Sequence, residues 1–148
     1  MFFQPKKILV ATDFSSHARA AADAAGVMAR AFDGKVTLAH VVPLTVYTDL
    51  ANHLEPRSLG MADLRETIER RVKADLESEL ARLKTDGVEA GFIMVDGPPA
   101  PELAKVAKEG NYDLVVIGTH GRTGLMHLAL GSVAENLVRL SSVPEVQR

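Results

Sequence analysis

Cysteine is absent from the 148-residue sequence. Its absence excludes disulfide bonds, thiolate metal sites and thiol catalysis, and it agrees with a reducing compartment. Residues 1–3 are far too short for the core of a signal peptide, and no apolar run approaches the ~20 residues needed to cross a bilayer. We therefore expect a cytoplasmic location and no membrane partner.

The sequence also lacks a large excess of either positive or negative charge. The 17 Lys and Arg residues nearly balance the 19 Asp and Glu residues, for a net charge of −2. Basic and acidic residues alternate between Arg65 and Lys84 instead of forming a basic patch, so we expect no nucleic-acid partner. Apolar residues make up 47% and charged residues 24% of the chain, which is ordinary for a globular protein. We expect one domain over residues 1–148.

Short apolar runs alternate with stretches of helical periodicity. The runs contain few polar residues, which is typical of strands covered on both faces in a parallel sheet. We expect strands at residues 7–12, 35–42, 92–95, 114–117 and 143–146. We expect helices at residues 16–33, with Ser15 or Ser16 as the cap, at 61–83, at about 103–107 and at 133–140. This alternation predicts an α/β fold with an open parallel five-stranded sheet and helices on both faces.

The connection at residues 43–58 shows no hydrophobic period and contains two prolines. It is longer than most connections in compact domains. We interpret it as a lid or a binding loop.

Glycines cluster after the fourth predicted strand. Gly118 and Gly121 follow that strand, nine residues intervene, and Gly131 and Ser132 open the last helix. Glycine lets main-chain N–H groups approach a ligand closely, and a helix N-terminus favours negative charge. The spacing predicts a loop that binds the phosphates of a nucleotide.

Asp13 follows the first predicted strand as Gly118 follows the fourth. In open parallel sheets, ligands bind at the carboxyl ends of strands, where the strand order reverses. If these two strands are neighbours, Asp13 faces the glycine loop across that crevice and a nucleotide can span it.

At these residues the chain resembles the universal stress protein family, in its nucleotide-binding branch. The likeness is carried by KILVATDFS, by YDLVVIGTHG and by the complete Gly-x2-Gly-x9-Gly-Ser signature. The resemblance implies a Rossmann-like fold with strand order 3-2-1-4-5 and a homodimer, often built by the last strand of each subunit. It also implies binding of ATP or another adenine nucleotide, with Mg or Mn.

The resemblance assigns roles to individual residues. Asp13 would lie near the ribose or near a metal bridging to the phosphates, and the main chain around Val41 would meet the adenine edge. Ala11 and Thr12 would form the wall between them. The phosphate path would be lined by Gly118, Thr119, His120, Gly121 and Arg122, with Gly131, Ser132 and Val133 at the start of the helix.

The chain departs from the family pattern at two places. Position 11 is Ala where many relatives carry Pro, and residues 144–148 are short and polar where relatives have an apolar strand. Two histidines outside the signature, His40 and His127, are interpreted as structural.

We weigh three functions against the sequence. The first is a regulatory module for stress responses. It would bind ATP without hydrolysing it, and bound ATP would change the surface that an unknown protein partner contacts. A slow ATPase or self-phosphorylating protein has less support, because the sequence offers few catalytic groups for phosphoryl transfer. The lysine of a Walker loop is absent beside Gly131 and Ser132. A structural dimer that binds no nucleotide would lack the glycines that are present here.

Overall fold

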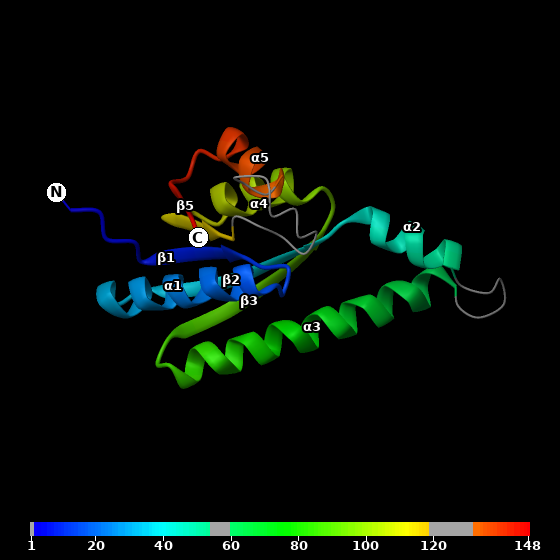
Figure 1. Cartoon of the computed structure of the whole chain (residues 1–148), viewed down its shortest axis with the longest axis horizontal. Coiled ribbons are helices and arrows are strands. Elements are labelled where there is room, and N and C mark those ends of the chain that lie inside the picture. The colour runs from blue at the N-terminus through cyan, green and yellow to red at the C-terminus, as the bar shows by residue number, and fades with distance from the viewer. Residues whose placement is uncertain (1, 54–59, 119–131) are drawn as a thin grey trace.

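A computed structural model describes residues 2–53, 60–118 and 132–148 (Figure 1). Its centre is a parallel sheet of five strands in the order β3-β2-β1-β4-β5, as the family resemblance implied. The strands are β1 (Lys7–Ala11), β2 (Lys35–Val42), β3 (Glu89–Asp96), β4 (Leu114–Ile117) and β5 (Glu145–Gln147). The helices are α1 (Ser16–Phe32), α2 (Leu44–His53), α3 (Met61–Thr85), α4 (Pro99–Glu109) and α5 (Ser132–Leu140).

The helices cover the two faces of the sheet. In Figure 1, α4 and α5 lie on one side of the strands and α1 and α3 on the other. Alternate residues of β1 point into separate cores: Ile8 and Val10 pack with α1 and α3, whereas Leu9 and Ala11 pack with α4 and α5. This burial on both faces is why the strand sequences are almost entirely apolar.

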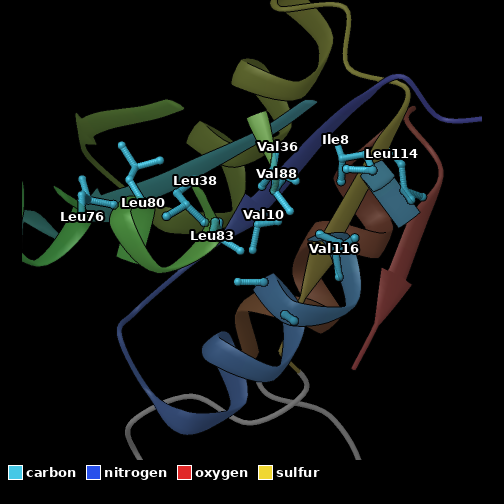
Figure 2. Close-up of a cluster of buried hydrophobic side chains, with 14 of the residues drawn as sticks. Ile8, Val10, Val36, Leu38, Leu76, Leu80, Leu83, Val88, Leu114 and Val116 are labelled. Carbon is cyan, nitrogen blue, oxygen red and sulfur yellow. The ribbon is translucent and has the colours of Figure 1, made fainter. Parts of the chain in front are cut away.

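The long helix α3 buries one stripe of its surface. Leu76, Leu80 and Leu83 project toward Val36 and Leu38 of β2, as Figure 2 shows. The exposed side of the helix carries charged residues at i, i+4 spacing, including the pair Arg70–Glu66 at 3.1 Å. The predicted amphipathic helix is confirmed. Its apolar residues recur every three or four positions, so they share the face that packs on the sheet.

Helix α1 begins and ends at residues with capping geometry. The Ser15 hydroxyl accepts a hydrogen bond from the Ala18 amide at 3.1 Å, which satisfies one of the free N–H groups of the first turn. At the other end, Asp33 adopts a left-handed conformation with φ 55°. Gly34 follows, where a Cβ would lie 2.9 Å from the Lys6 carbonyl oxygen. Both predicted boundaries are confirmed.

Some strand boundaries differ from the prediction. β1 ends at Ala11, although the Thr12 amide still donates to the Ala39 carbonyl at 2.9 Å. β3 begins at Glu89 instead of Phe92, because it pairs with β2 along the whole length of both strands, from Lys35 opposite Glu89 to Val42 opposite Asp96. β5 is centred on Val146 and pairs with β4 after Pro144, which cannot itself donate to the ladder.

The interpretation of residues 43–58 as an aperiodic loop is wrong for residues 44–53, which form α2. The Pro43 carbonyl accepts a hydrogen bond from the Val46 amide at 3.0 Å and starts the helix. Within α2 only Tyr47 is buried, and Val46 packs partly buried against the same core. Leu44 and Leu50 stay exposed, so most of the apolar surface of this helix is not buried. Residues 54–59 lie outside the described part of the chain.

Across the described ranges, no helix has both the length and the apolar character that a membrane span requires.

Candidate functional site

A cavity of about 650 Å³ opens at the carboxyl ends of β1, β2 and β4. It is lined by residues 11–15 after β1, residues 39–43 around the end of β2, and Ile117 and Gly118 at β4. Side chains from α1 to α5 complete its walls. β1 and β4 are neighbours in the sheet, so Asp13 and Gly118 lie in the same cavity as the sequence predicted. This is the place where the strand order reverses.

The turn between β1 and α1 is held by its own side chains. The Thr12 hydroxyl accepts a hydrogen bond from the Phe14 amide at 3.1 Å, and Asp13 Oδ1 accepts one from the Ser15 amide at 2.9 Å. Ser15 then caps α1. The carboxylate of Asp13 is therefore tied to the backbone of the turn and placed in the cavity wall.

His40 lies directly beside this turn. Its Nδ1 is 2.7 Å from the Thr12 carbonyl oxygen, and its ring centroid is 4.8 Å from that of Phe14. A carbonyl oxygen can only accept, so Nδ1 carries the proton in this contact. Phe14 has φ 65°, a left-handed conformation that costs a residue with a side chain about 1–2 kcal/mol. His40, interpreted from the sequence as structural, thus also lines the cavity.

The face of the sheet toward α4 and α5 forms an apolar wall. Ala11 and Val41 are each 7% exposed, and both belong to the core cluster that Leu103 and Val133 join from the two helices. Val133 is the second residue of α5, so the N-terminus of that helix reaches the cavity. An apolar wall next to a helix N-terminus suits a ligand with a flat apolar ring and an anionic tail.

Gly118 packs closely against α1. A Cβ at this position would lie 3.0 Å from the carbonyl carbon of His17 and 3.1 Å from its oxygen. The glycine spacing predicts that position 118 is glycine so that a ligand can approach the main chain. Contact with the first turn of α1 is a second reason for glycine here, and it holds with or without a ligand.

Part of the predicted phosphate path lies outside the part of the chain that the structure describes. Thr119, His120, Gly121, Arg122 and Gly131 lie outside the described residues, as does His127. Ser132 is the first residue of α5, as the signature required.

The cavity also has walls that sequence reasoning missed. Val46 of α2 and Ile68, Arg71 and Asp75 of α3 line its other side. The sequence placed Arg71 on a solvated face, and its side chain is indeed 81% exposed, but it stands at the cavity rim paired with Asp75 at 3.4 Å. Ile68 already belonged to the predicted apolar stripe. No sequence pattern indicated that α2 and this part of the α3 stripe would line the same cavity as the ends of β1 and β2.

Tyr47 anchors α2 to the end of β3. Its hydroxyl donates to Asp96 Oδ1 at 2.8 Å, and Arg65 of α3 pairs with the other oxygen of the same carboxylate. Burial, together with the hydrogen bond to Asp96, raises the pKa of Tyr47 to about 12. The phenol therefore stays a hydrogen-bond donor at neutral pH, and the contact holds the α2 wall of the cavity in place.

The described residues contain no group of three His, Cys, Asp or Glu side chains that could hold a metal ion. A metal at Asp13 would therefore need most of its ligands from the phosphates of a bound nucleotide and from water.

Comparison with known proteins relates this chain to a family. The model of the universal stress protein family matches residues 5–146. Universal stress protein MJ0577 of Methanocaldococcus jannaschii is 30% identical over 152 residues, an alignment that covers 94% of this chain and 91% of that protein.

Two solved structures extend this likeness to three dimensions. The structure of hypothetical protein MJ0577 superposes with a TM-score of 0.82 at 28% identity and covers 99% of this chain and 98% of that one. A universal stress protein in complex with cAMP superposes with a TM-score of 0.67 at 25% identity, covering 97% of this chain and 96% of that one.

Proposed function

The chain belongs to the universal stress protein family, and we propose that it is a regulatory module that holds ATP in the cavity at the carboxyl ends of β1, β2 and β4. The main support for the proposal is that Asp13, Val41, Gly118 and the N-terminus of α5 line one cavity. The similar protein solved with cAMP supports an adenine nucleotide as the ligand. Hydrolysis is not part of this proposal.

The residues present fit the parts of a nucleotide. Ala11 and Thr12 form a wall next to Val41, whose main chain would meet the adenine edge. Val133 and the other first amides of α5 would face the phosphates, because a helix N-terminus carries unpaired N–H groups and a positive partial charge. The signature residues from Thr119 to Gly131 would complete the phosphate path.

Asp13 would accept hydrogen bonds from the ribose, and Mg²⁺ or Mn²⁺ would arrive with the phosphates. A divalent cation would neutralise phosphate charge, and Asp13 would offer it a carboxylate, since no group of three metal-binding side chains occurs among the described residues. The cytoplasmic location and the existence of a protein partner stay predictions.

Calorimetry of the purified protein with ATP and Mg²⁺ tests the proposal. We expect a dissociation constant in the micromolar range, which corresponds to ~8 kcal/mol. A Gly121→Val variant should lose binding, because the new side chain would occupy the predicted phosphate path. Gly91→Val is the matched control, since a Cβ at Gly91 meets no atom within 4 Å. Absence of heat at millimolar ATP, or full binding by the Gly121 variant, would contradict the proposal.

We also propose that the protein forms a homodimer through β5. β5 is the last strand of the sheet in the part of the chain that the structure describes, so no described strand pairs with its outer edge. Val146 is 38% exposed, and Val138 and Leu140 of α5 are 53% and 55% exposed. A second copy would cover apolar side chains that a monomer leaves in water.

A lysine at position 146 should turn the dimer into a monomer. Val146→Lys places a charge on the exposed edge strand, where it disfavours pairing with another strand. Sedimentation velocity should give a dimer for the wild type and a monomer for the variant. Val27→Lys, on α1 and 57% exposed, should remain a dimer. A wild-type protein that sediments as a monomer at high concentration would disprove this interface.

A further inference from the structure

We infer that His40 and Phe14 form a brace that positions Asp13 for the ribose hydroxyls of the bound nucleotide, so that His40 determines the preference for ribonucleotides over nucleotides lacking those hydroxyls. The inference rests on the function proposed above.

The brace acts on both sides of Asp13. His40 Nδ1 donates to the carbonyl of Thr12, the residue before Asp13, at 2.7 Å. The imidazole packs at 4.8 Å against the ring of Phe14, the residue after it. Each neighbour of Asp13 in the chain is therefore held by one side chain that comes from β2.

The conformation of the turn depends on this support. Phe14 has φ 65°, and a bulky residue remains in the left-handed region only where its surroundings stabilise it. Asp13 Oδ1 accepts the Ser15 amide at 2.9 Å, so a change of backbone at position 14 would also turn the carboxylate. Loss of the imidazole removes a hydrogen bond and a ring contact from the same short segment.

The carboxylate of Asp13 determines which groups of a ligand can bind at the braced turn. An ionised carboxylate only accepts hydrogen bonds, and the two hydroxyls of a ribose can donate to it. A ribose hydroxyl that donates to this carboxylate adds a charge-assisted hydrogen bond, which a ligand without that hydroxyl does not make. The ligand class is therefore a nucleotide with intact ribose hydroxyls.

Calorimetry with two nucleotides tests the inference. Wild-type protein should bind ATP at least about tenfold more tightly than 2′,3′-dideoxyadenosine triphosphate. His40→Leu should weaken ATP binding about tenfold and leave the dideoxy nucleotide unchanged, which removes the preference. Asp13→Asn should remove it as well, and the double variant should lose no more than Asp13→Asn alone, because both residues act on one contact.

Control variants separate positioning from general destabilisation. His53→Leu makes the same substitution in α2, where the exposed imidazole hydrogen-bonds to the Asp49 carbonyl of its own helix, and it should keep the wild-type preference. Phe14→Leu keeps an apolar side chain without the aromatic ring. It provides a second folded variant, also expected to lose preference, if His40→Leu does not fold.

The outcomes distinguish the two proposals. Wild-type protein that binds neither nucleotide disproves the proposed function and this inference with it. Wild-type protein with the preference, in which His40→Leu keeps that preference or weakens both nucleotides equally, disproves the brace alone.

Discussion

Gly118→Ala should lower the free energy of unfolding by about 1–3 kcal/mol and weaken ATP binding by about tenfold or more. The added methyl group would meet the backbone of His17 at 3.0 Å, so the end of β4 or the first turn of α1 must move. Both segments adjoin the cavity, because Gly118 and Ser15 line it. Denaturant unfolding and calorimetry measure the two effects.

Gly91→Ala is the control for this substitution. It adds the same methyl group to β3, at a position where no atom lies within 4 Å of the new Cβ. We expect unchanged ATP affinity and a stability equal to or slightly above that of the wild type, since glycine weakens a strand. If Gly118→Ala behaves like this control, the close contact with α1 is not a constraint on the site.

Replacing Leu76 with alanine should cost about 2–5 kcal/mol of unfolding free energy, the largest stability effect we expect. Leu76 is fully buried between α3 and the sheet (Figure 2), so its removal loses apolar contacts and leaves a cavity. The leucine does not line the cavity at the ends of β1, β2 and β4, so the folded variant should keep the ATP affinity of the wild type. Urea titration followed by circular dichroism gives the stability change.

Leu44→Ala is the matched substitution for comparison. Leu44 is 60% exposed at the start of α2, so its truncation should change stability by no more than about 0.5 kcal/mol. Similar losses for Leu44→Ala and Leu76→Ala would contradict the assignment of Leu76 to the core.

Helix α2 marks where local patterns stop being informative. Its one buried residue is Tyr47, whose hydrogen-bond partner Asp96 lies 49 residues further along the chain. Such a contact leaves no periodic signal in the segment itself. The long helix α3, by contrast, was predictable because its buried residues recur every three or four positions.

The candidate site divides in the same way. Asp13 and Gly118 could be placed at the cavity from sequence, because each directly follows an apolar strand and parallel strands present their carboxyl ends together. His40 could not be recognised as part of the site. Its contact with Thr12 spans 28 residues and exists only because β1 and β2 pair side by side.

The sequence by itself determined the order of the strands and of the helices other than α2, the caps of α1 and the signature that predicts a nucleotide site. These features depend on residues within one or two turns of each other, whose spacing and backbone preferences act locally. The tertiary structure alone decided that α2 closes one wall of the cavity, that Gly118 touches His17, and that His40 braces the turn at Asp13. Those contacts join distant segments, and only the packing of helices against the sheet brings them together.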